Sequence, residues 1–433
     1  MAQTFLNKGF FKGNRNRLYS LMQPDSMAIL YSNDLMPRNG DQYFSFRQNS
    51  DLFHLTGIAQ EETKLLVFPD CPLEQFREVL FIRKTNERIA TWEGHKYTQE
   101  EARKISGINK VMWVDSFDDV MKQVSTLTSN IYLNQNEHWG AGDIPQSLQL
   151  REGKKLKERF PFHNYLRLAP LMTEIRLIKQ HEEIETMQHA CNITADAFKR
   201  ILQFVKPGIN EYQIEAEITH EFLRNGAMGH AYAPIVASGK NAAILHYIDN
   251  NQQVNSGDLI LFDIGCEFDH YSSDMSRTIP ASGKFSRRQK EVYNAVLRVF
   301  KQAREMMVPG TTIDRINKQV ENLLQDEHIK LGLYSEKDIQ DKDDALKLLK
   351  SYYPHGTSHF MGLDVHDVGT KYERLEAGMV LSCEPGIYIK EEEIGIRLEN
   401  DILITHDQPV DLMKDIPIET DEIEEWMTKK SWN

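Results

Sequence analysis

The fold of this chain is set by one apolar stretch that ends in an acid, Leu259-Ile260-Leu261-Phe262-Asp263-Ile264-Gly265. Its continuous β-rich run predicts a buried strand. A turn near Phe268-Asp269 would fold Tyr271-Ser272-Ser273-Asp274 back beside this strand. A hairpin centred at that turn places Asp263 directly opposite Asp274, with both carboxylates on one face.

A second segment repeats the arrangement. Met379-Val380-Leu381-Ser382-Cys383-Glu384 is again an apolar run that ends in an acid, and Ile394-Gly395-Ile396-Arg397-Leu398-Glu399 returns after an acidic turn. Centring this hairpin between Glu391 and Glu392 places Glu384 opposite Glu399. The chain therefore predicts two cross-strand carboxylate pairs.

Each hairpin follows a pair of predicted helices. An apolar stripe with helical spacing covers residues 184–205, stops at Pro207-Gly208, and is followed by a second helix. The same plan returns about a hundred residues later, with a helix over 289–307, a stop at Pro309-Gly310 and another helix. The repetition indicates an internal duplication over residues 173–433.

Residues 1–172 have a different pattern and predict a separate mixed α/β domain. Short β-rich runs alternate there with polar helical stretches at 100–105 and 117–125. The predicted strands are residues 27–31, 65–68, 79–82 and 131–133. The basic stretch Arg151–Arg159 is a candidate boundary region. The fold class is therefore α/β (α+β), with a mixed first domain and a duplicated second one.

Four acids arranged in this way require a counter-charge. Like charges opposite each other destabilise a sheet, and burying them unpaired is costly. Carboxylates with one imidazole suit a divalent ion such as Mn, Co, Fe or Zn, and four carboxylates can hold two such ions. Any one of these acids taken alone also fits a solvated strand end.

The imidazoles come from the histidine segment, Tyr353-Pro354-His355-Gly356-Thr357-Ser358-His359-Phe360-Met361-Gly362-Leu363-Asp364-Val365-His366-Asp367. His359 is the best candidate ligand. If the residues after it are extended, His366 lies too far away to share its ion and stands over the substrate instead. His355 and His246 are candidates for substrate contacts, and for either one a structural role fits equally well.

Composition excludes several other classes. The chain has 433 residues, 40% of them hydrophobic, and a net charge of −13, which disfavours a non-specific nucleic-acid binder. There is no apolar run long enough for a membrane span, and the four separated cysteines indicate a reducing compartment, by default the cytoplasm. The basic N-terminus fits either a transit peptide or, as we favour, an opening helix with Phe10, Phe11, Leu18, Leu21 and Met22 on one face.

At these residues the sequence resembles the pita-bread metallopeptidases and, among them, aminopeptidase P. The family has five metal ligands, in the order Asp, Asp, His, Glu and Glu. All five are present here, as Asp263, Asp274, His359, Glu384 and Glu399. Phe46-Arg47-Gln48-Asn49-Ser50-Asp51 and Leu55-Thr56-Gly57 resemble the aminopeptidase P N-terminal domain. The resemblance covers nearly the whole chain.

The resemblance implies two metal ions, most simply Mn with Co or Zn as alternatives. Asp274 and Glu399 would bridge them, Asp263 would complete one shell, and His359 with Glu384 the other. A metal-bridging hydroxide would attack an Xaa-Pro bond. His366 would stabilise the oxyanion, and Glu384 would pass the proton to the leaving nitrogen. The resemblance assigns the proline pocket to three residues, His246, His355 and Arg397.

The resemblance also implies a homo-oligomer, a dimer or a tetramer. Trp92 resembles a tryptophan that some relatives insert into a neighbouring subunit's active site, although a place in the core of the first domain fits as well. Prolidase is the nearest alternative, with the same fold and metals but a restriction to dipeptides. Methionine aminopeptidases usually lack the first domain. Creatinase and non-catalytic pita-bread binding proteins are further alternatives without this metal set.

Overall fold

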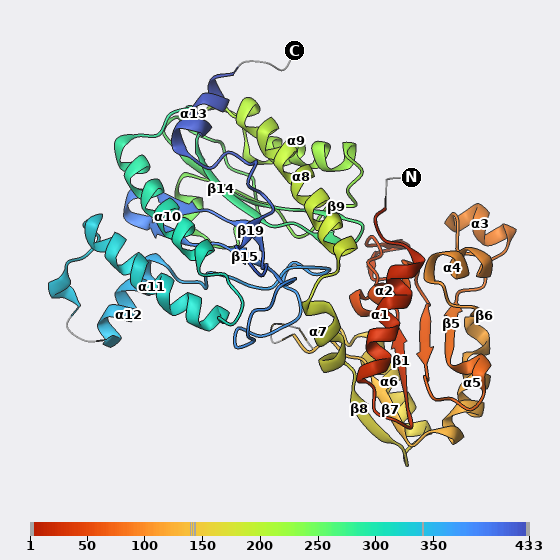
Figure 1. Ribbon diagram of the computed structural model, residues 1–433. Coiled ribbons are helices and arrows are strands. Elements are labelled where there is room, and N and C mark those ends of the chain that lie inside the picture. The colour runs from red at the N-terminus through yellow and green to blue at the C-terminus, as the bar shows by residue number, and fades with distance from the viewer. Residues whose placement is uncertain (1–3, 139, 141, 143, 340–341, 430–433) are drawn as a thin grey trace. The chain divides into compact units, whose positions relative to one another are not determined.

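The computed structural model describes residues 4–138, 140, 142, 144–339 and 342–429 (Figure 1). The described chain forms two compact units, Thr4–Arg176 and the residues from Leu177 onward. Within these described ranges, every helix is too short or too polar to span a membrane. The four cysteines lie in described parts of the chain and are buried free thiols.

The first unit is built on a six-stranded mixed sheet with the order β6-β5-β4-β1-β7-β8. The central strand β1 is buried along its whole length and pairs antiparallel with β4 and parallel with β7. Four of these strands confirm the sequence prediction. The strands are β1 (Ser26–Tyr31), β4 (Lys64–Val67), β5 (Glu78–Ile82), β6 (Lys110–Trp113), β7 (Asn130–Leu133) and β8 (Asn164–Arg167).

Helices cover both faces of this sheet, and an apolar core lies on each side. The predicted opening helix is confirmed as α1, whose Phe10, Phe11 and Leu18 are buried. A short exposed hairpin, β2 (Pro37–Asn39) with β3 (Gln42–Tyr43), stands apart from the sheet. The helices are α1 (Lys8–Leu21), α2 (Ser50–Thr56), α3 (Glu87–Glu93), α4 (Gln99–Ser106), α5 (Phe117–Val124), α6 (Leu148–Arg159) and α7 (Ala169–Leu177).

The prediction of a boundary region at Arg151–Arg159 is wrong. These residues belong to α6, which Ser147 caps through a hydrogen bond from the Leu150 N–H. Leu156 of this helix packs into the core, and the chain then adds β8 to the edge of the sheet beside β7. The basic residues are the solvated face of an amphipathic helix, which composition alone does not distinguish from a linker.

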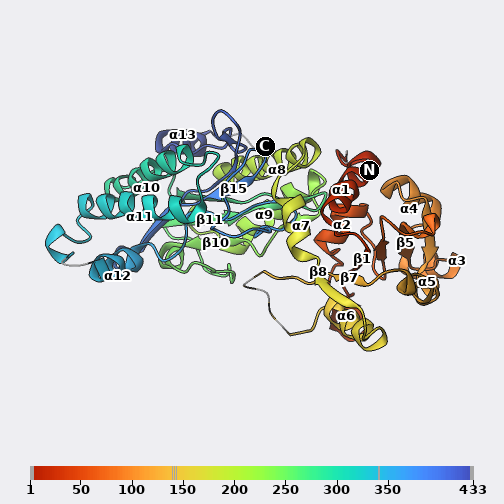
Figure 2. The same cartoon turned by 60° about the horizontal axis from the view of Figure 1, so that its bottom comes forward.

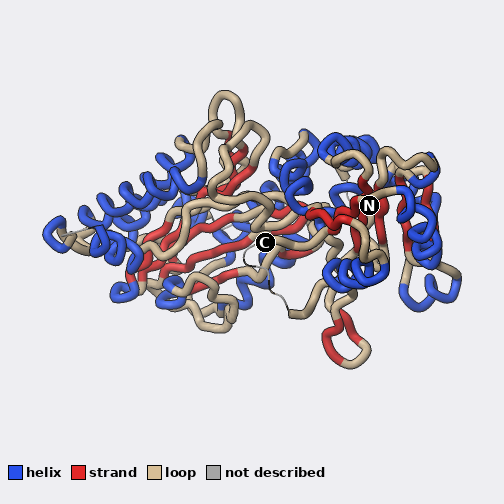
Figure 3. Tube along the Cα trace, turned by 90° about the horizontal axis from the view of Figure 1, so that it is seen from below, coloured by secondary structure: helices blue, strands red, loops and turns tan. Residues whose placement is uncertain are grey.

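The second unit confirms the duplicated plan of two helix pairs. The pairs are α8 (His181–Phe204) with α9 (Glu211–Arg224) and α10 (Arg287–Glu305) with α11 (Ile313–Lys330). Helices α8 and α9 pack on β12 and β10, and α10 packs on β15 and β17. In Figures 2 and 3 the helices lie alongside the strands of this unit. Two further helices are α12 (Lys342–Tyr352) and α13 (Thr420–Thr428).

The strands of this unit form several small sheets that adjoin one another. In the first half β11 lies between β10 and β14, and in the second half β15 pairs with β18 while β16 pairs with β17. The halves meet where the Glu399 N–H donates to the Ser276 carbonyl oxygen, at 3.1 Å. The strands are β9 (Gly229–His230), β10 (Ile235–Ser238), β11 (Leu259–Ile264), β12 (Cys266–Phe268), β13 (Tyr271–Ser272), β14 (Met275–Pro280), β15 (Val380–Cys383), β16 (Gly386–Ile389), β17 (Ile394–Arg397), β18 (Asn400–Leu403) and β19 (Val410–Asp411).

Candidate metal centre

The second hairpin has the predicted register. Cys383 pairs with Asn400 on one side of a short interruption, and Gly386 pairs with Arg397 on the other. Both pairings belong to the same register, which places Glu384 opposite Glu399. The alternation of side chains along the strands predicted this register correctly because the turn lies at Glu391 and Glu392, as expected.

The register predicted for the first hairpin is wrong by two residues. Asp263 pairs with Ser276, so Asp274 is its diagonal neighbour. The turn is made by Asp269 and His270, which both have positive φ, and it lies one residue later than predicted. Because side chains alternate with a period of two, a shift of two residues keeps Asp274 on the same face as Asp263.

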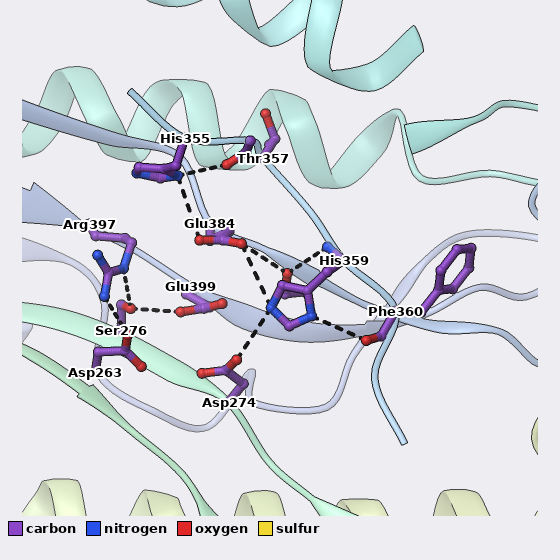
Figure 4. Close-up of polar contacts among 12 residues, drawn as sticks. Asp263, Asp274, Ser276, His355, Thr357, His359, Phe360, Glu384, Arg397 and Glu399 are labelled. Carbon is purple, nitrogen blue, oxygen red and sulfur yellow. Dashed lines mark hydrogen bonds and ion pairs between the residues drawn. The ribbon is translucent and has the colours of Figure 1, made fainter. Parts of the chain in front are cut away.

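Both carboxylate pairs and His359 converge on one site (Figure 4). Asp274, His359 and Glu399 each offer an atom, and these atoms lie within 4.8 Å of one another. The His359 Nε2 lies 3.4 Å from Asp274 Oδ2 and 3.7 Å from Glu384 Oε1. Three ligand types at these separations match the donor set expected around a divalent ion.

Neutral and basic side chains hold the carboxylates in place. The Tyr232 hydroxyl lies 2.7 Å from Asp263 Oδ1 and 2.5 Å from Asp274 Oδ1, so it links both acids of the first hairpin. The Arg397 guanidinium contacts Asp263 Oδ2 at 2.5 Å and donates to the Ser276 hydroxyl at 2.7 Å. Neither Tyr232 nor Ser276 was singled out in the sequence. Ser276 could have been found from the period of two that places it on the same face as Asp274.

Crowding of buried acids shifts their pKa values. Burial raises the pKa of Asp263 to about 6, against the opposing charge of Arg397. Burial likewise raises the pKa of Glu384 to about 7, although His359 and Arg397 oppose it. Burial with the charges of Asp274 and Glu384 raises the pKa of Glu399 well above its usual range. Additional positive charge close by would favour the ionised form of all three acids.

The same buried acids also shift the pKa of His359, and a backbone hydrogen bond orients its ring. Burial alone would lower its pKa, but the hydrogen bond with Asp274 and the charge of Glu384 outweigh burial and raise the pKa to about 9. Its Nδ1–H donates to the Phe360 carbonyl oxygen at 3.1 Å, which directs Nε2 toward the acids. A backbone acceptor on the other ring nitrogen is the usual arrangement of a metal-ligating histidine. The donor set therefore fits divalent metal ions.

The other predicted histidines lie around this cluster. His355 Nε2 lies 2.8 Å from the Tyr388 hydroxyl, and its Nδ1 lies 3.7 Å from Glu384 Oε2. Burial, with the nearby charges of Arg397, Lys350 and His246, lowers the pKa of His355 to about 3. His246 is exposed on a loop that lines a cavity of about 460 Å³.

The segment after His359 is not extended, so the geometric reason given for separating His366 from His359 is wrong. The chain bends back between the two residues, and their rings meet edge to face with centroids 4.5 Å apart. Gly362 within the bend allows the Asp367 carboxylate to approach, because a Cβ there would overlap it. His366 is exposed beside the candidate ligand.

Trp92 does not belong to the core of the first unit. It lies on α3, a helix without buried residues, and its side chain is 82% exposed. The core interpretation is therefore wrong.

The fold and this donor set define a metal-dependent hydrolase with two homologous halves, and comparison with known proteins agrees. Residues 185–406 match metallopeptidase family M24, and residues 11–132 match the aminopeptidase P N-terminal domain. The Xaa-Pro aminopeptidase of Haemophilus influenzae is 35% identical over 98% of this chain and 98% of its own length.

Two structures of Escherichia coli aminopeptidase P are similar along the whole chain. The form with the inhibitor Pro-Leu is 32% identical, with a TM-score of 0.87 over 98% of this chain and 99% of its own. The zinc-substituted form in complex with product is 31% identical, with a TM-score of 0.86 over 99% of this chain and 100% of its own. The chain belongs to metallopeptidase family M24 and has the pita-bread fold, and this membership implies divalent metal ions.

Proposed function

We propose that this metallopeptidase removes the N-terminal residue from peptides with proline in the second position. The observation that carries the proposal is the convergence of Asp274, His359 and Glu399 within 4.8 Å of one another. The aminopeptidase P N-terminal domain in the same chain favours this activity over that of a methionine aminopeptidase. The Pro-Leu inhibitor of the Escherichia coli relative resembles what remains of a peptide once the residue before proline is removed.

In this proposal Asp263, Asp274, His359, Glu384 and Glu399 would hold two divalent ions, with Asp274 and Glu399 serving both. When bound, such ions polarise a carbonyl and lower the pKa of a water. Manganese is the proposed native metal, with cobalt and zinc as alternatives. Purified protein treated with a chelator and then given Mn, Co or Zn would test this choice by the rate recovered with each ion.

Glu384 is the proposed proton carrier. A carboxylate beside the reacting atoms can accept a proton and then return it to the leaving group. A prolyl amide nitrogen carries no hydrogen, so it must be protonated before it can leave. His366, whose ring contacts that of His359, would donate a hydrogen bond to the developing oxyanion.

The proline side of the substrate would lie among His246, His355 and Arg397. His355 remains neutral because of its lowered pKa, and therefore binds as a hydrogen-bonding group and not as a cation. Arg397 is buried and already paired with Asp263, so its main effect is to orient that acid and Tyr388.

Prolidase activity is the alternative to be tested directly. Incubation with an Xaa-Pro dipeptide and an Xaa-Pro-Yaa tripeptide separates the two activities. Cleavage of the tripeptide at the Xaa-Pro bond supports an aminopeptidase, and cleavage of the dipeptide alone contradicts it. A protein that binds no divalent ion and cleaves neither peptide would instead be a non-catalytic binding protein.

Three further properties belong to the same proposal. We propose that residues 1–172 and 173–433 act as the two domains, and that the protein is a dimer or tetramer in which Trp92 reaches a neighbouring active site. Sedimentation of the intact protein and of Trp92→Ala, with their hydrolysis rates, tests the assembly. A cytoplasmic location is proposed on the four buried free thiols, and fractionation of cells tests it.

A further inference from the structure

The loop from Phe360 to Asp367 joins the two central histidines and closes on itself. The Asp367 N–H donates to the Phe360 carbonyl oxygen at 2.9 Å, and the His359 Nδ1–H shares the same acceptor at 3.1 Å. This closure explains why the rings of His359 and His366 meet although the two residues are seven positions apart in the sequence. Whatever holds the loop closed therefore sets the position of one histidine relative to the other.

A buried ion pair lies inside this loop. The Lys179 Nζ lies 3.0 Å from Asp367 Oδ2, and both side chains are 1% exposed. The backbone of Lys179 is itself fixed, because its N–H donates to the Gly378 carbonyl oxygen at 2.9 Å. The ammonium group thus reaches the loop from an anchored position 188 residues earlier in the chain.

The loop is shaped to fit this pair. A Cβ on Gly362 would overlap the Asp367 carboxylate and lie 3.0 Å from Lys179 Cε. Two further backbone bonds attach the loop to the strands, from the Met361 N–H to the Val380 carbonyl oxygen and from the Ser272 N–H to the Gly362 carbonyl oxygen, both at 2.9 Å. Both bonds lie near the His359 end, whereas the ion pair with Lys179 holds Asp367 at the other end, next to His366.

We propose that Lys179 is a positioning residue for His366 and His359 and acts through its ion pair with Asp367. A surface pair would contribute little, whereas removing one member of a fully buried pair leaves an uncompensated charge that the loop must expose. The loop would then open, and His366 would move away from its place beside His359. The expected effect on hydrolysis rests on the proposed function, whereas the expected effects on loop exchange and on metal binding do not.

The test compares Lys179→Met with the unaltered protein and with Arg200→Met. The control removes an ion pair with Glu217 that joins α8 and α9 in the same unit. For Lys179→Met we expect kcat to fall about 100-fold with KM changed less than about threefold, as for a misplaced catalytic group. We expect metal affinity to fall about tenfold, as for a disturbed ligand orientation. Hydrogen exchange of residues 360–367 should become faster, and the control should change none of these values more than about twofold.

The double variant Lys179→Met/Asp367→Asn keeps the inference testable if the single variant does not fold. It leaves no buried charge, so we expect it to fold while faster exchange in the loop and a lowered kcat remain. Unchanged exchange and metal affinity in both variants would overturn the role of Lys179. If the unaltered protein hydrolyses no Xaa-Pro peptide, the proposed function fails, and exchange and metal affinity still decide the inference.

Discussion

The two carboxylate hairpins direct their acids to the same site but differ in register. In the second hairpin Glu384 lies opposite Glu399, and in the first hairpin Asp274 is offset by two residues from the position opposite Asp263. The offset places Ser276 opposite Asp263, where its hydroxyl donates to Glu399 Oε2 at 2.6 Å. The first hairpin thereby supplies a hydrogen bond to a proposed metal ligand of the second hairpin.

This difference shows which property of a hairpin the chemistry requires. Both hairpins keep their acids on one face, and this property survives a shift of two residues but not a shift of one. The two acids need not be direct cross-strand partners, because their side chains can bring the carboxylate groups together across an offset of two residues. Duplicated halves can therefore diverge in register while the donor set stays intact.

The largest expected effect comes from removing the offset acid itself. Asp274→Ala takes away a ligand that the proposal assigns to both ions. The rate of hydrolysis should therefore fall by more than the roughly 100-fold typical for loss of a residue that only orients a metal ligand. Metal content should fall as well, while the first unit stays folded. The control is Glu392→Gln at the tip of the second hairpin, an acid exposed in a pair with Arg288. A metal-loaded, active Asp274→Ala protein would contradict the bridging role.

Two hydroxyl groups that hydrogen-bond to the carboxylates of the hairpins give the next test. Tyr232→Phe removes a hydroxyl that reaches both acids of the first hairpin, and Ser276→Ala removes the hydroxyl that donates to Glu399. We expect each to lower metal affinity by about 10- to 100-fold, with Tyr232→Phe the larger because two ligands lose their partner. Isothermal titration with Mn measures both. Equal affinity in the unaltered protein and both variants would show that the ligands orient themselves without these hydroxyls.

The stability of the metal-free protein should depend on pH. Folded Asp263 and Glu384 hold protons up to about pH 6 and about pH 7, whereas the unfolded chain releases them near pH 4. His359 likewise holds its proton up to about pH 9 when folded and only to about pH 6.5 when unfolded. The folded state therefore binds more protons at these three groups. Below about pH 6.5 the lowered pKa of His355 has the opposite effect, so we expect stability to fall with rising pH chiefly between about 6.5 and 9.

Bound divalent ions should reverse this trend, because they bind the ionised carboxylates and the neutral imidazole. Thermal unfolding with chelator and with Mn, measured at several pH values between about 6.5 and 9, gives the comparison. A chelated protein whose melting temperature rises with pH over this range would contradict the pKa shifts.

Local sequence patterns predicted much of this molecule. The helix pairs followed from apolar stripes ended by Pro-Gly, and four strands of the first unit followed from β-rich runs. The first turn was predicted one residue too early because Asp269 and His270 adopt positive φ without a glycine, so the usual turn signal is absent. Lys179 could not be found, because its partner lies 188 residues away and no local pattern connects them.

The tips of the two hairpins provide the smallest and last test. Substitution by glycine should raise the free energy of unfolding at one tip and lower it at the other. Glu393 is exposed in a left-handed conformation with φ of 53°, which glycine adopts without strain, so Glu393→Gly should raise the free energy of unfolding by less than about 1 kcal/mol. His270 also has positive φ, at 70°, but it is buried, with Nδ1 3.7 Å from Glu267 Oε1. His270→Gly should therefore lower the free energy of unfolding by about 1 kcal/mol, since the lost contacts outweigh the relieved strain. Urea unfolding of both variants measures the difference. Stabilisation by both would mean that His270, like Glu393, serves only the turn and that the buried side of the first tip contributes nothing to its register.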